Sequence, residues 1–522
     1  MAITFILGSV AAVLCAIFYC IRRQQMRVFK NMGIPGPEPN FLFGNLLSLK
    51  TKSFHEIYQE WTKTYGTTYG YFEGPTPVLV TSDTEILHQV FVKQFSKFHA
   101  RKVFPVQVDP DKDEDVHMFF ARGERWKRLR SIVNPAFSSA KMRKMSPVIN
   151  QCVNNLVGNV GGECDRDATF NIHEQFQRLT LDTICHCAFN LETRALQNPN
   201  DPFLKHCHGV IEDTTKRPLL FLMGFLFPAL HALWIFIYYF LRNIQFNPFF
   251  WLEEKINSVI EERKSTDFDG EDMLQLMMKA RFKGRCFPYE KQADRGFEMS
   301  QSNADQSIAK TLSNKEIVSQ ALLFTLAGYE TTSTSLAYIF YELARNPDVQ
   351  EDIFDEIQRQ YPNKTDVPSY DNVRSLTYLD QVIKETLRKY VVASSVIARQ
   401  CRETTVVEGI TIPKGMLVQA DVWSLHRRED LWGPDTEEFQ PERFAPERQK
   451  DRHPMAWMPF GGGPRMCAGL RFALLQAKTA TVELIRNFKF ALSDDMTAPL
   501  QLIEGATVCP KNGIHLTAKR RS

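Results

Sequence analysis

The pattern of hydrophobic and polar positions predicts a mainly helical protein with small β-sheets. Residues 126–260 follow a mostly helical pattern, and residues 375–390 form another helical segment. Residues 66–80 place aromatic and β-branched side chains around a Gly-Pro turn, which predicts a hairpin. Residues 409–424 alternate around a Pro-Lys-Gly turn and are also predicted as strand. Residues 284–313 are polar and broken, and we expect a mobile loop there.

A long helix is predicted after this loop. Ser313 and Glu316 form a capping box, with serine at the N-cap and glutamate three residues later. The helical pattern continues to Arg345 and ends before Asn346-Pro347, because the residue before a proline disfavours helix. About 32 residues at 1.5 Å each give roughly 48 Å. A helix of this length often crosses a whole domain.

The N-terminus has the pattern of a membrane anchor. Residues 1–21 carry no charged side chain, and Arg22 and Arg23 follow at once. About 20 apolar residues span a bilayer core, and basic residues after the span place the following chain in the cytosol. A cleaved signal peptide is the alternative, although no basic n-region or cleavage site is clear. We predict an anchor over 1–23, a basic and Pro/Gly-rich hinge over 24–37, and one domain over 38–522.

A second apolar stretch, Pro218 to Leu241, contains no Lys, Arg, Asp or Glu. As a second membrane span it would separate residues 35–217 from everything after 242, which a single domain forbids. Pro218 and Pro228 also interrupt the run. We therefore expect a surface that dips into the membrane, backed by core helix.

Composition excludes several classes of protein. The 63 Lys and Arg residues nearly balance the 60 Asp and Glu residues. A net charge of +3 on 522 residues therefore gives no indication of a nucleic-acid-binding protein. The chain has 11 cysteines. Their odd number in a long chain argues against a small disulfide scaffold. The sequence contains no C-x-x-C pair, so the spacing of a zinc knuckle is absent.

Cys467 differs from the other cysteines by its neighbours. It lies in FGGGPRMCAG, residues 460–469, just before an apolar helical run. A cysteine there can be a nucleophile, half of a disulfide, a zinc ligand, a buried structural thiol or the single ligand of an iron.

Three further groups carry candidate chemistry, each with an ordinary alternative. Within the long helix, Glu330 and Thr331 follow a glycine, and a threonine hydroxyl that bonds to the i−4 carbonyl can open a helix; the alternative is an exposed acid and a packed threonine. Trp126 and Arg130 lie one turn apart and offer an anion an indole N–H and a guanidinium, or form a solvated basic edge. Glu385 and Arg388 form a common i,i+3 pair.

Together these stretches resemble the cytochrome P450 family, the haem–thiolate monooxygenases. The carrying pattern is Phe460-x-x-Gly463-x-Arg465-x-Cys467-x-Gly469. A chance match has a frequency of about 10⁻⁷ to 10⁻⁶ per window, at roughly one in twenty per position. The other groups occur in the family's order, including Pro441-Glu442-Arg443-Phe444 before the cysteine. The resemblance covers essentially the whole chain, and in detail it is to the animal clan of broad-specificity xenobiotic and steroid oxidisers, including nematode members.

The resemblance implies a cytochrome P450 fold and a haem b cofactor. Cys467 is the expected axial thiolate, within a loop shaped by Phe460, Gly463 and Gly469. Glycines leave room for the backbone to approach the haem, and nearby N–H groups stabilise the thiolate. Arg465, Trp126 and Arg130 are expected to reach the haem propionates. Because haem supplies four nitrogens of its own, one cysteine is enough, and this removes the zinc interpretation.

The resemblance also implies the reaction, in which one oxygen atom of O₂ is inserted into a lipophilic small molecule. Thr331 is expected to hold the bound oxygen, and Glu330 to take part in the proton relay. Glu385, Arg388 and Arg443 are expected to form a buried structural network. Two other functions remain open: a haem–thiolate isomerase or dehydratase, and a non-catalytic haem or lipid binder. An intact Glu330–Thr331 pair argues against both.

The chain has no G-x-G-x-x-G after a strand, so its electrons must come from a partner. The resemblance implies NADPH–cytochrome P450 reductase, with cytochrome b5 as a second donor, at the endoplasmic reticulum membrane. Arg125, Lys127, Arg128 and the basic run 443–452 are a candidate docking face.

One segment departs from the family pattern. After the Glu385–Arg388 helix the family has a proline and soon an arginine for a propionate. Residues 389–396 have neither, and Arg399 is the nearest candidate. This departure bears on the substrate pocket, for which we expect Phe119, Phe120, Ala327 and residues 391–397 to be lining residues.

Overall fold

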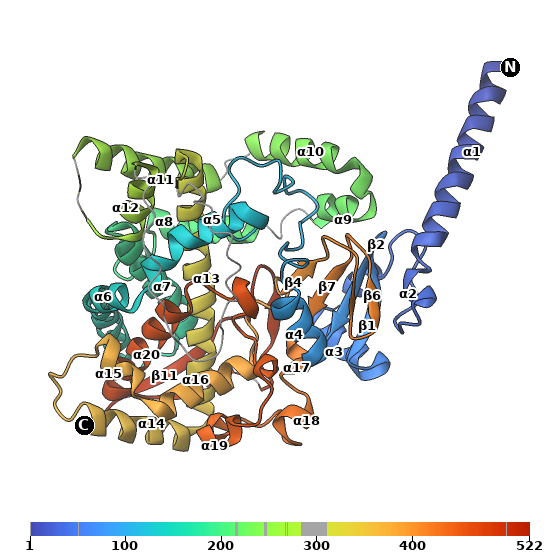
Figure 1. Ribbon diagram of the computed structural model, residues 1–522. Helices are drawn as coiled ribbons and strands as arrows, with labels where there is room; N and C mark the ends of the chain where they lie inside the picture. The colour runs from blue at the N-terminus through green and yellow to red at the C-terminus, as the bar shows by residue number, and fades with distance from the viewer. Residues whose placement is uncertain are drawn as a thin grey trace. The chain divides into compact units, whose positions relative to one another are not determined.

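The computed structural model describes residues 2–50, 52–213, 218–244, 248–266, 268, 270–282, 311–496 and 498–521. All but the last three residues of the loop predicted over 284–313 lie outside these ranges. Helices dominate and the sheets are small, as the sequence predicts (Figure 1). The chain forms two compact units. The first comprises Met1–Asp109, Lys216–Gln245 and Ser394–Leu425, and the second comprises Pro110–Thr215, Phe246–Ala393 and His426–Ser522.

A four-stranded sheet organises the first unit. Its order is β1 (Thr68–Glu73), β2 (Thr76–Thr81), β7 (Leu417–Ala420) and β4 (Ala398–Gln400). The β1–β2 hairpin confirms the prediction over 66–80, with Thr68 opposite Thr81. Strand β2 pairs with β7 in parallel, and β4 pairs with β7 antiparallel. Residues Ile57, Tyr58 and Trp61 of α3 (Phe54–Tyr65) pack on this sheet.

The strand predicted over 409–424 is correct only in part. Residues Ile410–Ile412 form β6, which pairs with β5 (Thr405–Val407), while β7 joins the larger sheet. After β7 the chain turns into α17 (Val422–Leu425). The Ser424 N–H donates to the Asp421 carboxylate over 3.0 Å, and this cap favours a helical turn over a continued strand.

The N-terminal segment is helical beyond the predicted anchor. Helix α1 runs over Ala2–Gln25, and its residues Thr4–Gln25 are apolar and long enough to be a candidate membrane span. Arg22 donates to the carbonyls of Phe41 and Leu42, over 2.9 and 2.6 Å. Part of the predicted hinge is a short helix, α2 (Val28–Asn31). The elbow then packs on β1, where a Cβ on Gly36 would lie 2.0 Å from the Gly70 carbonyl oxygen.

The apolar stretch after residue 218 forms two helices with a sharp bend. Helix α9 (Pro218–Leu226) and helix α10 (His231–Ile244) are joined by a 3₁₀ turn at Pro228–Leu230, and the bend is 109°. The indole N–H of Trp234 donates to the Phe227 carbonyl over 2.9 Å and closes the bend. Large apolar side chains of this pair are exposed, among them Leu219, Phe236 and Phe240. Immersion of this surface in a membrane stays a prediction.

The second unit is built around α13 (Asn314–Arg345). The Ser313–Glu316 capping box is present, and the bounds match the predicted helix. The helix packs against α7 (Ile172–Phe189), α11 (Pro248–Ser265), α16 (Thr377–Lys389) and α20 (Leu470–Asn487) (Figure 1). Gly328 permits the approach of α7, because a Cβ there would lie 3.1 Å from Ile184 Cγ1. The segment predicted over 375–390 is the helix α16.

The second unit contains further α-helices and two small sheets. The helices are α5 (Gly123–Val133), α6 (Ser139–Asp165), α7 (Ile172–Phe189), α8 (Pro202–Asp213), α11 (Pro248–Ser265), α12 (Met273–Phe282), α14 (Pro347–Gln360), α15 (Tyr370–Arg374), α16 (Thr377–Lys389), α18 (Glu429–Trp432), α19 (Pro446–Gln449) and α20 (Leu470–Asn487). One antiparallel sheet has the order β3 (Phe170–Asn171), β11 (His515–Arg520), β8 (Phe488–Leu492), and β9 (Leu502–Glu504) pairs with β10 (Val508–Pro510). The short elements left in the first unit are a 3₁₀ helix at Leu46–Lys50, α4 (Thr84–His88) and a π-helical turn at Gln89–Lys93.

Candidate functional site

The cysteine loop is a closed turn at the N-terminus of α20. The Cys467 N–H donates to the Phe460 carbonyl over 3.0 Å, and the Met466 N–H donates to the Gly463 carbonyl over 2.9 Å. Gly461 and Gly463 have φ values of +75° and +66°, which side-chain-bearing residues rarely adopt. These two glycines are therefore required by the turn itself. A Cβ on Gly469 would meet only Phe137, at 3.7 Å.

The thiol of Cys467 is exposed, unlike most cysteines in this unit. Cys152, Cys185, Cys187 and Cys207 are buried, and desolvation raises the pKa of Cys152 and of Cys207 to about 12. Those thiols stay protonated and act as small apolar side chains. Cys467 is thus the accessible thiol on a rigid loop, while the buried four are inert.

Arg465 and Trp126 meet beside this loop. The guanidinium carbon of Arg465 lies 4.7 Å from the centroid of the Trp126 ring. Arg465 also donates to the carbonyls of Phe119, over 3.1 Å, and Ala121. The Met118 N–H of the same loop donates to Gln320 of α13 over 2.8 Å. Residues 118–121 therefore connect α13 with the cysteine loop.

A narrow strip of α13 is left uncovered in a helix that is otherwise largely buried. Ala327 is exposed, and Thr331 and Ser335 are partly exposed at successive turns. The Thr331 hydroxyl donates to the Ala327 carbonyl over 2.8 Å, the predicted i−4 bond. The opening that we expected there is not seen, because α13 is continuous from Asn314 to Arg345. A single hydrogen bond from the Thr331 hydroxyl to the Ala327 carbonyl is compatible with an unbroken helix.

Glu330 points into the buried side of α13. Its carboxylate accepts hydrogen bonds from Gln177 over 3.5 Å and from Thr507 over 3.3 Å. The residue is 6% exposed, and burial raises the pKa of the carboxyl. A buried acid of raised pKa exchanges protons near neutral pH more readily than an exposed one.

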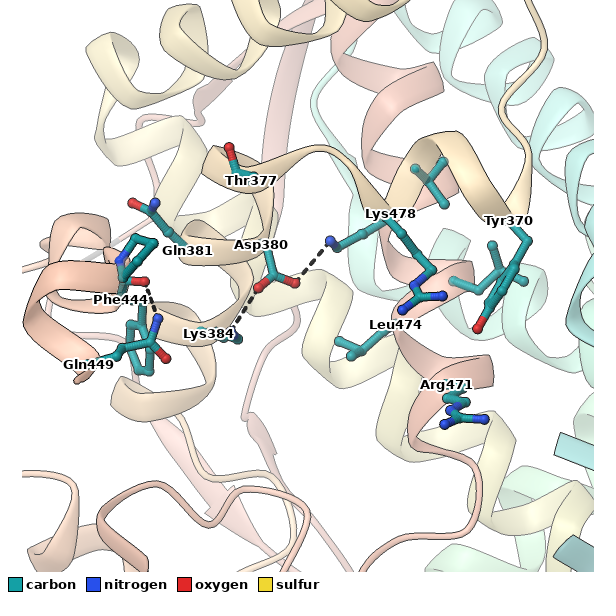
Figure 2. Close-up of a pocket in the computed structure, with 14 residues that line it drawn as sticks. Tyr370, Thr377, Asp380, Gln381, Lys384, Phe444, Gln449, Arg471, Leu474 and Lys478 are labelled. Carbon is teal, nitrogen blue, oxygen red and sulfur yellow. Dashed lines mark hydrogen bonds and ion pairs between the residues drawn. The ribbon is translucent and has the colours of Figure 1, made fainter. Parts of the chain in front are cut away.

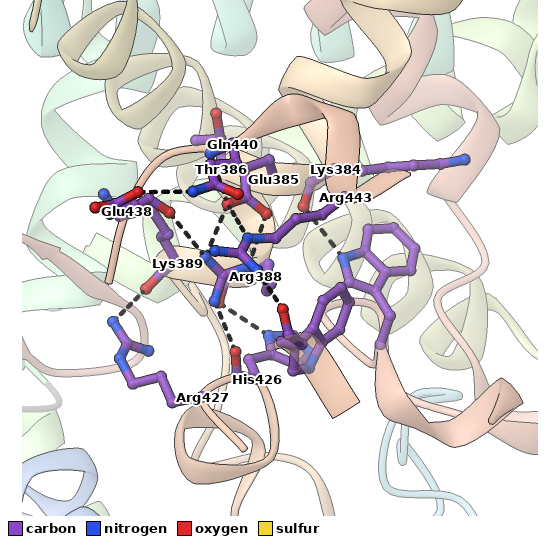
Figure 3. Close-up of polar contacts among 12 residues, drawn as sticks. Lys384, Glu385, Thr386, Arg388, Lys389, His426, Arg427, Glu438, Gln440 and Arg443 are labelled. Carbon is purple, nitrogen blue, oxygen red and sulfur yellow. Dashed lines mark hydrogen bonds and ion pairs between the residues drawn. The ribbon is translucent and has the colours of Figure 1, made fainter. Parts of the chain in front are cut away.

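The predicted buried network of Glu385, Arg388 and Arg443 is present (Figure 3). Arg388 donates to both oxygens of Glu385, over 2.7 and 2.8 Å, and Arg443 Nε lies 3.5 Å from Glu385 Oε1. Arg443 also donates to the carbonyls of Trp432 and Asp435. All three charged side chains are at most 5% exposed, so the network is a structural one.

Sequence reasoning missed His426, which lies between this network and the cysteine loop. Its Nδ1 is 3.1 Å from the Arg388 carbonyl oxygen, and its Nε2 accepts the Met458 N–H over 2.9 Å. No local signal marks this residue, because its partners lie 38 and 32 residues away.

Most of the predicted docking face is engaged within the protein. Arg125 and Arg128 both pair with the buried Glu316, and they also donate to backbone carbonyls. Arg443 lies in the buried network, and the guanidinium of Arg452 stacks on Trp432 at 4.1 Å. Arg125 and Arg128 nevertheless stay partly exposed, so a docking role for this face stays a prediction.

A different cationic surface surrounds a cavity of about 500 Å³ (Figure 2). Residues of α15, α16, α19 and α20 line it, with the phenyl ring of Phe444 at one side. Its cations are Arg374, Lys384, Arg471 and Lys478, and Asp380 accepts ion pairs from Lys384 at 2.8 Å and Lys478 at 2.9 Å.

The other residues predicted to contact a propionate or to line the substrate pocket lie as follows. Arg130 lies on α5 one turn from Trp126. Phe119 and Phe120 are in edge-to-face contact, with ring centroids 4.8 Å apart. Arg399 lies in the first unit, buried, with its guanidinium 4.4 Å from the centroid of Phe91. A propionate contact for Arg399 stays a prediction.

Comparison with known proteins shows the family. The cytochrome P450 family model matches residues 34–518, and the chain belongs to that family. The protein is therefore an oxidoreductase, a haem–thiolate monooxygenase whose family binds haem b through a cysteine thiolate. The family also implies a redox partner and lipophilic substrates in general.

Two groups of animal relatives match nearly the whole chain. A putative cytochrome P450, CYP13A8, of Caenorhabditis elegans is 33% identical over 506 residues, which cover 94% of this chain and 96% of the relative. Cytochrome P450 3A28 of Bos taurus is 34% identical over 494 residues, which cover 94% of this chain and 91% of the relative. Both groups agree with the predicted resemblance to animal oxidisers with nematode members.

The residues of the second unit suit a haem. A rigid loop presents an exposed thiol, which is the soft ligand that a haem iron takes as a thiolate. Arg465 and Trp126 supply a guanidinium and an indole next to that loop, the donors that a propionate needs.

Proposed function

We propose that Cys467 is the axial thiolate of the haem. Its exposure carries this proposal, since a structural cysteine at the same place would be buried like Cys152 or Cys185. The hydrogen bond from the Cys467 N–H to Phe460 and the two left-handed glycines hold the loop in one conformation. Bound haem supplies dioxygen activation and the transfer of one oxygen atom to the substrate.

Arg465, Trp126 and Arg130 are the proposed propionate ligands. Arg465 is held in place by two backbone carbonyls and the Trp126 ring, so its guanidinium is preorganised. Preorganised donors lose little side-chain entropy when an anion binds.

Thr331 is the proposed hydroxyl at the oxygen-binding face. Because it donates its proton to the Ala327 carbonyl, its lone pairs face the uncovered strip of α13. In this arrangement the hydroxyl would accept a hydrogen bond from a group that lies over the uncovered strip. Glu330 is the proposed proton carrier, since burial favours its neutral form and thereby a transferable proton.

The proposed substrate is a lipophilic small molecule. Phe119 and Phe120 belong to the loop that Arg465 and Gln320 hold, and Ala327 leaves room on α13. Aromatic and small apolar side chains favour an apolar ligand without selecting a narrower class.

The proposed electron donor is NADPH–cytochrome P450 reductase, with cytochrome b5 as a second donor. Arg374, which is exposed, and Arg471 at the cavity in Figure 2 offer positive charge to acidic side chains of a partner. Arg471 lies at the start of α20, four residues after Cys467, so a partner here would be close to the thiolate loop. Charge reversal at Arg374 and Arg471 is expected to raise the KM for reductase and weaken its salt dependence.

The proposed location is the endoplasmic reticulum membrane, with the catalytic domain in the cytosol. Helix α1 supports a single N-terminal anchor, and the basic residues Arg22 and Arg23 at its end support this orientation.

The first test is the reduced, carbon monoxide-bound difference spectrum of the parent and of Cys467→Ser. A strongly red-shifted Soret band in the parent alone supports the assignment. A band typical of histidine ligation in both proteins overturns it. NADPH consumption with reductase and a lipophilic substrate, with formation of a hydroxylated product, then tests the reaction.

A further inference from the structure

His426 is a fully buried histidine that the proposed catalytic residues do not include. It follows α17 in the chain and lies between α16 and the segment that leads into the cysteine loop (Figure 3). Both ring nitrogens are used. Nδ1 lies 3.1 Å from the Arg388 carbonyl oxygen, and Nε2 lies 2.9 Å from the Met458 nitrogen.

These two contacts define the tautomer of the ring. A carbonyl oxygen only accepts, so Nδ1 must carry the hydrogen. A backbone N–H only donates, so Nε2 must have a free lone pair. The ring is therefore neutral, and burial, with the charge of Arg388, lowers the pKa of His426 to about 3.

On one side the ring is joined to the charged network twice. His426 donates to the Arg388 carbonyl, and Arg388 Nη1 donates back to the His426 carbonyl over 2.8 Å. The Arg388 guanidinium is in turn held by both oxygens of Glu385. This side of the ring is thus attached to a rigid and buried part of the molecule.

On the other side the ring holds the entry to the cysteine loop. Met458 is 1% exposed, and its carbonyl accepts the N–H of Gly461, over 3.0 Å, at the first left-handed glycine of the loop. The Cys467 N–H then donates to the carbonyl of Phe460. The hydrogen bonds at Met458, Gly461 and Cys467 therefore connect the His426 ring with the segment that carries the proposed thiolate.

From these contacts we infer that His426 is a positioning residue, which fixes the Met458–Cys467 segment relative to the Glu385–Arg388 network through its bond to the Met458 N–H. This inference rests on the proposed role of Cys467 as the haem ligand. Without the bond, Met458 would have a buried and unsatisfied N–H, and the loop would sample positions in which the thiolate is lost.

Two variants separate the bond to Met458 from the bond to Arg388. In His426→Gln the side-chain oxygen reaches about as far as Nε2 and can accept the Met458 N–H. In His426→Asn the side-chain amide reaches only as far as Nδ1 and can donate to the Arg388 carbonyl. The full-length, haem-loaded proteins are compared by the reduced carbon monoxide spectrum over time and by hydrogen exchange at the Met458 amide.

We expect the Gln variant to keep the red-shifted band and slow exchange. The Asn variant should exchange the Met458 amide roughly tenfold faster, equivalent to about one net hydrogen bond, and should lose the red-shifted band several times faster. Equal behaviour of the two variants, whether both resemble the parent or both lose the band, overturns the inference, because packing alone would then explain the ring. A parent that lacks the red-shifted band overturns the role of Cys467 instead, while Met458 exchange still reports on the bond to His426.

Discussion

The guanidinium of Arg465 lies over the indole ring of Trp126, 4.7 Å from its centroid, although the two residues are separated by most of the chain. Arg465 also donates to the carbonyls of Phe119 and Ala121. One side chain therefore joins helix α5, the loop before it and the cysteine loop. This arrangement gives Arg465 a structural role in addition to the proposed contact with a propionate.

Replacing Arg465 by methionine is expected to lower both stability and haem retention. The carbonyls of Phe119 and Ala121 lose their donor, and the buried Ala121 carbonyl left unsatisfied costs about 1–3 kcal/mol. Thermal unfolding of the haem-free protein measures the structural part, and the rate of haem transfer to apomyoglobin measures the binding part. Arg359→Met, on the exposed side of α14, is the matched control. A haem-loss rate equal to that of the parent would contradict the propionate contact.

The buried pair of Glu385 and Arg388 is expected to be far more important for folding than an exposed pair. Glu385→Gln leaves two buried guanidinium groups without their counter-charge, which costs roughly 3–5 kcal/mol. Asp371→Asn removes an exposed partner of Arg143, and this loss should be much smaller because solvent screens the pair. Urea unfolding of both variants makes the comparison, and similar losses would show that the buried network is not structural.

Thr331→Val is expected to uncouple electron use from product formation. The variant keeps the shape of the side chain and loses the lone pairs that face the uncovered strip. Product formation should fall by roughly 10²-fold, the size of a typical proton-delivery effect, while NADPH consumption continues and the carbon monoxide spectrum is unchanged. Thr331→Ser should recover most of the product. If the valine variant forms product in the same proportion to NADPH consumed as the parent, Thr331 has no part in the proposed mechanism.

Glu330→Gln is expected to change how stability depends on pH. Burial raises the pKa of Glu330 above its usual 4.5 in the folded state. The neutral carboxyl therefore stabilises the fold fully below pH 4.5, and this contribution is lost as the pH rises through the raised value. The loss is at most about 1.4 kcal/mol per pH unit.

The glutamine variant should thus match the parent at low pH and become relatively more stable as the pH rises. Unfolding free energies across this range measure the difference. If the variant and the parent change in parallel, Glu330 is ionised in the fold and is not the proposed reserve of a transferable proton.

The exposed aromatic residues of α10 are expected to bind lipid. Phe236 and Phe240 are 66% and 55% exposed, with ring centroids 6.2 Å apart. In a chain that lacks residues 2–25, Phe236→Asp with Phe240→Asp should reduce sedimentation with phosphatidylcholine vesicles by tenfold or more, since burying each ring gains roughly 1.5–3 kcal/mol. Val367→Asp is the control, at an equally exposed position of the second unit. Unchanged sedimentation would mean that the exposed rings of α10 do not bind lipid and that α1 alone attaches the protein to the membrane.

Local signals in the sequence predicted the elements well. The Ser313–Glu316 capping box and the Asn346-Pro347 stop define α13 because both act on neighbouring backbone groups. The Thr331 bond to Ala327 was predictable for the same reason, as was the hairpin around Gly74-Pro75. The strand predicted over 409–424 ends early because the Asp421 cap competes with the alternating pattern.

The partners of charged side chains were decided by the tertiary structure. Arg125 and Arg128 resemble a solvated basic edge in the sequence, and only the fold places the buried Glu316 beside them. In the same way, the fold brings Thr507 to Glu330, which lies 177 residues away in the sequence. His426 connects Arg388 with Met458 because the fold places these two residues on either side of its ring.

The sequence by itself therefore determined the family and the main helices, and it supplied the candidate residues for the chemistry. Their types and spacings are local properties that the printed chain contains. Only the tertiary structure decided which cations face inward, which face of α13 is uncovered and which residues support the cysteine loop. Those choices depend on burial, which makes an unpaired polar group costly and so selects partners that are distant in the sequence.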